Sequence, residues 1–303
     1  MHADDDAGQE GDPGHRPVQH DRSLVAPTDF RPAHRVVTAP DVRRGAGGRL
    51  FVLHGFLGAG RNWAAVARGL VRSRPDWEAV LVDLRLHGDS LDAPPPHDLD
   101  ACARDVARLV AHLPAPAGPC ALLGHSFGGK VALAAAPLLA VPPVQTWLID
   151  ATPAPGGSRA GAAELLDLAA RHRAGFPDRR AGADAVEAAG FTRFLAEWMA
   201  TNLERRGGGY AWRFDPQALR ALLDSYARAD LWSVVEQPPA GTELRFVRAT
   251  RGSILAADAA ARLARREADG APVRLQRLEG GHWLNADDPE GLVQLLREGL
   301  PRA

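Results

Sequence analysis

Short runs of consecutive apolar residues alternate along this chain with longer stretches in which apolar residues recur at helical spacing. The runs are typical of strands covered on both faces of a sheet, and the spaced stretches of helices with one buried face. The predicted strands are 50–53, 79–82, 120–123, 146–149, 244–248 and 273–278, and the predicted helices are 62–71, 99–113, 128–139, 256–267 and 289–300. This alternation predicts an α/β fold with a mostly parallel central sheet and helices on both faces.

The segment 151–239 interrupts this pattern, because it is rich in Ala and Arg, favours helix and contains no convincing strand. Enzymes with open parallel sheets bind their ligands at the carboxyl ends of the strands. We therefore expect an inserted helical cap, or lid, over a core formed by residues 35–150 and 240–303. Residues 1–34 are polar and acidic, with Phe30 as their only aromatic residue, and are expected to be a flexible tail.

Composition excludes several classes of protein. The chain has 303 residues, and its 36 Lys and Arg against 37 Asp and Glu give a formal charge of −1. This balance argues against partners such as nucleic acid or an anionic membrane. The most apolar stretch, 131–149, is broken by three prolines, and no signal peptide is visible, so a cytoplasmic monomer or homodimer is expected. Cys102 and Cys120 form no metal-binding or redox motif and are expected to be buried thiols.

The strongest chemical signal is Gly124-His125-Ser126-Phe127-Gly128, which follows a predicted strand and precedes a predicted helix. A serine on such a sharp turn is held exposed in a strained conformation, and the flanking glycines let the backbone pass without a Cβ clash. The amino end of the helix then lies beneath any negative charge that develops. We therefore expect Ser126 to be a nucleophile.

A serine nucleophile needs a base to take its proton and an acid to orient that base. Only His282 of the eleven histidines stands in a loop between the last predicted strand and the last helix, which makes it the expected base. The acid is expected to be Asp150, at the end of the strand after the nucleophile. Asp258, beyond the following strand, is the alternative.

The remaining site residues follow from the same chemistry. An oxyanion hole needs two backbone N–H groups, and Phe127 and Phe56 are the expected donors. The candidate substrate-pocket residues are His54, His125, Trp198 and Trp283. Such a site requires neither a cofactor nor a metal.

Five motifs occur in the order in which the α/β-hydrolase superfamily has them. They are His54-Gly55-Phe56-Leu57-Gly58, residues 83–90 (DLRLHGDS), residues 124–130 (GHSFGGK), Asp150 within 149–153 (IDATP), and Gly281-His282-Trp283. From residue 35 onward the chain resembles this superfamily, and within it the small serine esterases of bacteria and their mitochondrial relatives. In that branch the acid follows the strand after the nucleophile, so the resemblance implies Asp150.

Together these features predict a hydrolase of small to medium carboxylic esters with a partly apolar acyl or alcohol group. One alternative is a C–C bond hydrolase or a lyase of the menaquinone pathway, because residues 53–63 are similar to those enzymes. They tend to have Arg where this chain has Lys130. A non-catalytic binding protein on the same fold is a second alternative. Dehalogenases and epoxide hydrolases use Asp as nucleophile, whereas position 126 is Ser.

Overall fold

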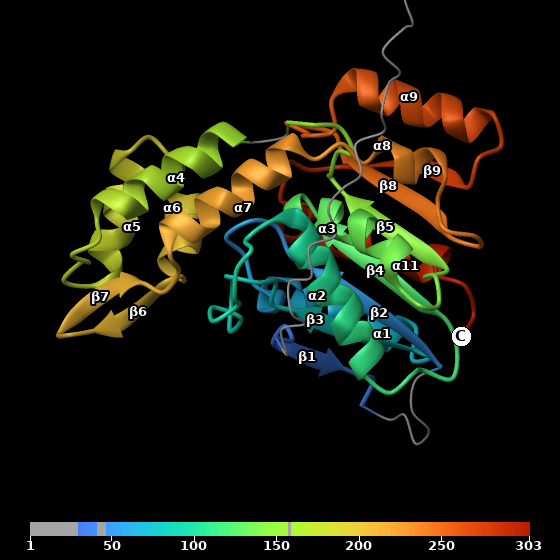
Figure 1. Cartoon of the computed structure of the whole chain (residues 1–303), viewed down its shortest axis with the longest axis horizontal. Helices are drawn as coiled ribbons and strands as arrows, with labels where there is room; N and C mark the ends of the chain where they lie inside the picture. Colours follow the sequence, from blue (N-terminus) through green and yellow to red (C-terminus); the bar gives the residue numbers. More distant parts are fainter. Residues whose placement is uncertain (1–29, 41–46, 157–158) are drawn as a thin grey trace, which may run out of the picture.

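The computed structural model describes residues 30–40, 47–156 and 159–303. A seven-stranded sheet with the order β1-β3-β2-β4-β5-β8-β9 lies at its centre (Figure 1). The strands are β1 (His34–Val37), β2 (Gly48–Leu53), β3 (Trp77–Val82), β4 (Cys120–His125), β5 (Gln145–Ile149), β8 (Glu243–Ala249) and β9 (Val273–Leu278). The edge strand β1 pairs antiparallel with β3, and the other neighbouring pairs are parallel. The predicted mostly parallel sheet is therefore confirmed.

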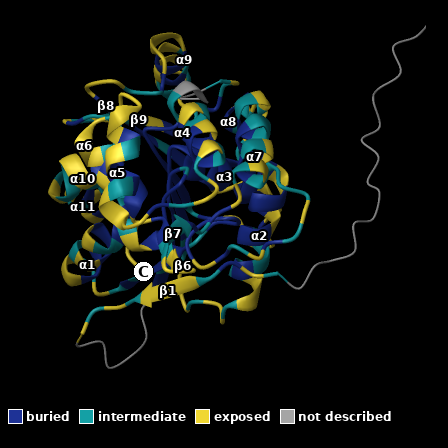
Figure 2. Cartoon of the chain, turned by 90° about the vertical axis from the view of Figure 1, so that its left-hand side faces the viewer, coloured by how far each residue is buried: buried dark blue, intermediate teal, exposed yellow. Residues whose placement is uncertain are grey.

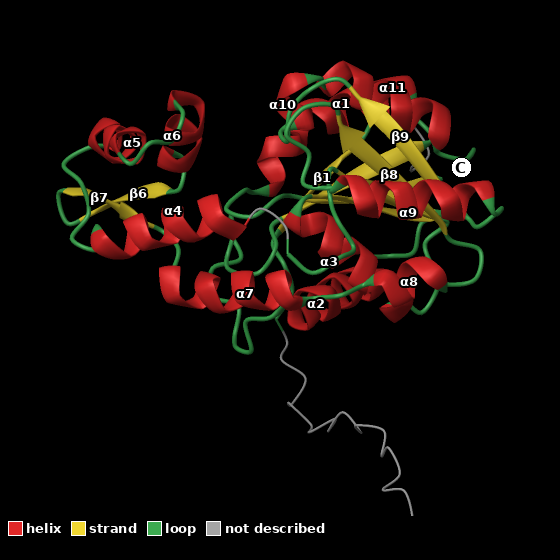
Figure 3. Cartoon of the chain, turned by 90° about the horizontal axis from the view of Figure 1, so that it is seen from above, coloured by secondary structure: helices red, strands yellow, loops and turns green. Residues whose placement is uncertain are grey.

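Helices cover both faces of the sheet, as predicted (Figure 3). One face is covered by α1 (Ala64–Ser73) and α11 (Pro289–Gly299), and the other by α2 (Leu99–His112), α3 (Phe127–Ala135), α8 (Trp232–Glu236) and α9 (Ala257–Ala268). Three short elements complete the core: the 3-10 turns Gly60–Trp63 and Ala136–Leu138, and α10 (Leu284–Asp287).

The central strands are continuously apolar because their successive side chains point into different helical layers. In β2, Leu50 and Val52 pack with α1 and α11, whereas Phe51 and Leu53 pack with α2 and α3. All four are at most 3% exposed. Full burial of each such side chain stabilises the fold by about 1.5–3 kcal/mol. Figure 2 shows the result, with buried strands inside and exposed outer faces on the helices.

Most of the cap projects beyond the edge of the sheet at which β4 and β5 end (Figure 1). It contains α4 (Arg159–Arg171), α5 (Arg179–Ala188), α6 (Arg193–Ala200), β6 (Leu203–Arg206), β7 (Gly209–Trp212) and α7 (Pro216–Arg228). The expectation that this segment has no strand is wrong. Gly207 and Gly208 both have positive φ, at 54° and 88°, and form the two-residue turn that joins the antiparallel β6 and β7.

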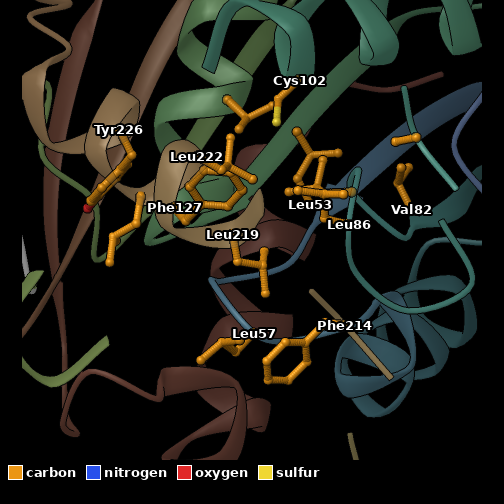
Figure 4. Packing of buried hydrophobic residues seen from close by; sticks show 14 of the residues in the cluster. Leu53, Leu57, Val82, Leu86, Cys102, Phe127, Phe214, Leu219, Leu222 and Tyr226 are labelled. Atoms are coloured by element: carbon orange, nitrogen blue, oxygen red, sulfur yellow. The ribbon is translucent and has the colours of Figure 1, made fainter. Parts of the chain in front are cut away.

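Cap and core share a hydrophobic cluster. On α7, Leu219, Leu222 and Tyr226 pack in the same cluster as Phe127 of α3 and Leu53 of β2 (Figure 4). The last helix of the predicted cap, α8, packs instead with α9 and β8 on the sheet. The cap is thereby held directly over the loop that joins β4 to α3.

The predicted tail, residues 1–34, falls largely outside the described residues. Its last five residues are described and do not behave as a tail. Phe30 packs against the main cluster, with the Arg85 guanidinium 5.8 Å from its ring, and β1 already begins at His34. Within the described ranges, no helix has the length and apolar character needed to cross a bilayer. Cys102 is buried and Cys120 half-buried, and both are free thiols.

Candidate active site

Ser126 lies at the turn between β4 and α3, in a strained backbone conformation with φ 53° and ψ −115°. The two glycines of the motif are required by close backbone contacts. A Cβ on Gly124 would lie 2.0 Å from the carbonyl oxygen of Gly128, and one on Gly128 would lie 2.5 Å from the carbonyl oxygens of Leu53 and His54. The local sequence therefore folds into the sharp turn that holds Ser126 at the carboxyl end of its strand.

Three side chains from separate loops form a continuous hydrogen-bonded chain. The Ser126 hydroxyl lies 3.0 Å from Nε2 of His282, and Nδ1 of His282 lies 2.7 Å from Oδ2 of Asp150. With Nδ1–H donating to the carboxylate, Nε2 is free to accept the serine proton. The structure thus brings together the three residues that the sequence predicted. The alternative acid, Asp258, is exposed on α9.

Asp150 is fully buried and has a positive φ of 41° at the end of β5. Its carboxylate accepts hydrogen bonds from the amides of Ala249 (3.1 Å) and Ile254 (3.2 Å) and from the Ser253 hydroxyl. Burial by itself raises the pKa of Asp150, but the hydrogen bonds from His282, Ser253 and Ala249 outweigh it and hold this pKa below its ordinary value. The carboxylate therefore stays ionised and can orient an imidazole.

His125 supports the loop that presents His282. Its Nε2–H donates to the backbone carbonyl of His282 at 2.8 Å, and the two imidazole rings lie 4.8 Å apart. Burial, followed by the nearby His282, lowers the pKa of His125 to about 3. His125 is therefore neutral at physiological pH and keeps a fixed donor toward this loop.

The two amides predicted for the oxyanion hole come from different segments of the chain. Phe127 is the first residue of α3, and Phe56 lies in the loop after β2. Within the part of the chain that the structure describes, neither amide has a hydrogen-bond partner. Leu57, with a positive φ of 61°, follows Phe56, and its carbonyl accepts a hydrogen bond from Asn202 of the cap at 3.0 Å.

His54 serves this loop rather than the serine. Its Nδ1–H donates to the Gly55 carbonyl at 2.8 Å, and its Nε2 accepts from the Leu84 amide at 3.0 Å. Burial lowers its pKa to about 4, so the ring is neutral. Both ring nitrogens are thus used to hold the loop against the end of β3.

A pocket of about 260 Å³ opens at Ser126 and His282. Trp198, Trp283 and His125 line this pocket, as predicted from the sequence. A neighbouring pocket of about 220 Å³ shares those three residues and is also lined by His54. The four candidate pocket residues therefore lie in the walls of one or both pockets.

Several supporting residues escaped the sequence analysis. The hydroxyl of Ser253 takes part in holding Asp150, and Asn202 connects the cap to the loop after β2. The buried ammonium of Lys130 donates to the carbonyls of Tyr226 and Ala229, both at 3.0 Å, and so ties α3 to the end of α7. The one available signal was a Gly-Ser pair, Gly252-Ser253, in a loop that lacks a carboxylate.

The described residues contain no group of three or more His, Cys, Asp and Glu side chains placed to hold a metal ion. The hydroxyl of Ser126 lies within hydrogen-bond distance of the imidazole of His282, which is itself bonded to the carboxylate of Asp150. Transfer of an acyl group to a serine uses a base and an acid of these kinds.

Comparison with known proteins identifies the family. The model of the "Alpha/beta hydrolase family" matches residues 50–295. The chain belongs to this family. The resemblance to the α/β-hydrolase superfamily is therefore confirmed.

Named proteins align with part of this α/β hydrolase. The "sn-1-specific diacylglycerol lipase ABHD11" of Mus musculus is 31% identical over 183 residues, and that of Danio rerio 29% identical over 182 residues. These alignments span 57% and 58% of this chain but only 56% of each relative's length. Among solved structures, a "Marine microorganism esterase" superposes with a TM-score of 0.71 at 19% identity, covering 89% of this chain and 99% of that one. The structural likeness shows the fold.

Proposed function

We propose that the protein hydrolyses carboxylic esters through an acyl-enzyme formed on Ser126. The observation that carries this proposal is the hydrogen-bonded chain from Ser126 through His282 to Asp150. The names of the relatives, lipase and esterase, agree with it. A cytoplasmic location and a monomeric or homodimeric state are proposed only on the sequence.

Each group has a role in the proposed reaction. Nε2 of His282 takes the Ser126 proton as Oγ attacks the ester carbonyl, and the amides of Phe56 and Phe127 stabilise the oxyanion. The imidazolium, stabilised by Asp150, then protonates the departing alcohol and leaves the acyl group on Ser126. A water molecule, deprotonated by His282, then attacks the acyl carbonyl. The imidazolium returns this proton to Oγ of Ser126 as the acyl–oxygen bond breaks, which releases the carboxylic acid and restores the free serine. Each oxyanion-hole donor contributes about 2.7–4 kcal/mol to lowering such a barrier.

The nucleophile can be tested directly with a fluorophosphonate, which labels only activated serines. Intact-mass spectrometry is expected to show one adduct on the wild type and none on Ser126→Ala. Hydrolysis of p-nitrophenyl butyrate should be lost in the same variant. An unlabelled wild type that folds normally would contradict the proposal and favour a binding role. Labelling without ester turnover, combined with cleavage of a vinylogous diketone, would favour a C–C bond hydrolase instead.

A further inference from the structure

Two indole rings belong to the lining that the catalytic pocket shares with the second pocket beside it, together with Gly55 and His125. Trp198 comes from α6 of the cap, and Trp283 directly follows the base His282. Their ring centroids lie 4.9 Å apart with an angle of 57° between the planes. Both rings line the catalytic pocket of about 260 Å³ and the second pocket of about 220 Å³. We define these two side chains as the tryptophan wall.

The second pocket starts close to the nucleophile. Gly55 lines both pockets, and a Cβ placed on it would lie 3.6 Å from the Cβ of Ser126. Ser126 itself lines only the first of the two. Phe194, which is 54% exposed, and Ala286 of α10 line the second pocket but not the first. The second pocket therefore borders the catalytic pocket along residues that include both indoles.

The catalytic pocket suits the acyl part of an ester. Its wall includes the apolar side chains Leu57, Leu165, Phe191, Leu195 and Ile254. The acyl group stays on Ser126 through both half-reactions, whereas the alcohol must leave after the first. A pocket with apolar walls beside Ser126 therefore suits the acyl group, which stays bound to the serine. Its volume lies just below the range of about 300–1,000 Å³ in which drug-sized ligands are held.

We propose that the tryptophan wall sets the upper limit on the length of the acyl chain that this enzyme accepts. Of its two side chains, Trp198 is the one that determines this limit, because it is contributed by α6 of the cap, whereas Trp283 directly follows His282 in the core. Truncating its side chain would join the two pockets and admit longer chains into the second one. This inference rests on the proposed ester hydrolysis and adds to it the class of preferred substrate, which is esters of short to medium acyl chains.

The test measures kcat/KM on p-nitrophenyl esters with acyl chains of two to twelve carbons. For the wild type, kcat/KM is expected to fall beyond medium chain length. Each methylene that gains a buried site is worth about fourfold in kcat/KM. Trp198→Ala is therefore expected to raise the ten-carbon to four-carbon ratio by about tenfold or more. Trp198→Phe, which keeps most of the ring, should give an intermediate ratio and serves if the alanine variant does not fold.

Two further variants distinguish an opened wall from a loosened cap. Phe194→Ala enlarges only the second pocket and is expected to leave the ratio unchanged. Ala286→Phe fills the second pocket; it should have no effect on the wild-type ratio but should reverse the gain made by Trp198→Ala. A general loosening of the cap would not be reversed by a side chain placed on α10.

The outcomes separate this inference from the proposed function. If the wild type cleaves esters through Ser126 but neither Trp198 variant changes the ratio, the tryptophan wall is not the limit. The same holds if Ala286→Phe fails to reverse the gain. If the folded wild type cleaves no ester of any length, the proposed ester hydrolysis fails and this inference fails with it.

Discussion

At the scale of single residues, the most informative side chain is Asp150. The sequence predicted that Asp150 follows the strand after that of Ser126. Because β4 and β5 pair in parallel, the carboxyl ends of these two strands are neighbours and Asp150 lies close to Ser126. Its carboxylate accepts hydrogen bonds from the Ser253 hydroxyl and from the amides of Ala249 and Ile254. These donors come from the end of β8 and the loop after it. That loop lacks a carboxylate of its own and instead supplies donors to one.

The choice of acid can be tested by amide substitution. Asp150→Asn is expected to lower kcat on p-nitrophenyl butyrate by about 10⁴-fold, because an amide favours the wrong imidazole tautomer. Asp258→Asn provides the matched control and should retain full activity, since Asp258 is exposed on α9. Equal losses in the two variants, or a larger loss in Asp258→Asn, would refute the role of Asp150.

The hydrogen bond from the Ser253 hydroxyl to Asp150 can be tested by removing the hydroxyl. Ser253→Ala removes a donor to the buried carboxylate, and hydrogen bonds to charged groups are worth about 1.5–3 kcal/mol. If most of this loss affects the orientation of His282, kcat should fall by about tenfold with little change in KM. Ser233→Ala, at an exposed position on α8, is the control. An unchanged kcat in Ser253→Ala would show that the two amides suffice to hold Asp150.

At the scale of elements, the sequence predicted the helices and strands that have a periodic apolar pattern. It missed the hairpin, whose two short strands depend on the turn between them. The predicted strand 273–278 coincides with β9, an edge strand of which only Val273 is buried. Its apolar Val273 and Leu275 alternate with Arg274 and Gln276, and such alternation is typical of a half-buried strand. The hairpin of β6 and β7 was missed because both strands have only four residues and β6, Leu203–Arg206, is mostly charged. The signal that could have revealed it is the Gly207-Gly208 pair, which permits the two left-handed turn residues.

The strand-turn-helix element around Ser126 depends on its glycines. Gly124→Ala is expected to destabilise the protein by about 3 kcal/mol or more, because the new Cβ would lie 2.0 Å from a backbone oxygen that cannot move independently. Gly161→Ala on α4 is the matched control, since its Cβ would meet only Phe191 at 3.8 Å. That variant should be as stable as the wild type or more stable, by up to about 1 kcal/mol. Urea unfolding measures both, and equal stabilities would contradict the clash.

At the scale of the whole molecule, the site is assembled by strand order. Ser126, Asp150 and His282 follow β4, β5 and β9, and the strand order β4-β5-β8-β9 brings these carboxyl ends to one edge of the sheet. Motif order was enough to predict this part. The contribution of Asn202 could not be predicted, because its contact with Leu57 joins residues 145 positions apart and depends on how the cap docks.

Three buried histidines lie at that edge, His54 and His87 in loops and His125 at the end of β4, and they make the fold sensitive to acid. Burial lowers the pKa of His54 to about 4, and those of His87 and His125 to about 3, from an ordinary value of 6.5. The unfolded chain therefore binds up to three protons between about pH 6.5 and 4 that the folded chain excludes. Protons bound more tightly by the unfolded state favour unfolding, so stability must fall as the pH is lowered through this window.

Each excluded proton contributes about 1.4 kcal/mol per pH unit, so near pH 5 these histidines together should lower the free energy of unfolding by about 4 kcal/mol per pH unit. Urea unfolding at half-unit steps from pH 7.5 to 4.5 measures this slope. His87→Asn should reduce it by about one proton, because the Asn amide can replace the Nδ1–H that donates to the Arg85 carbonyl but does not titrate. A slope that stays the same in this variant would mean that His87 is already protonated in the folded protein, and its environment in the loop after β3 would then have to be charged rather than apolar.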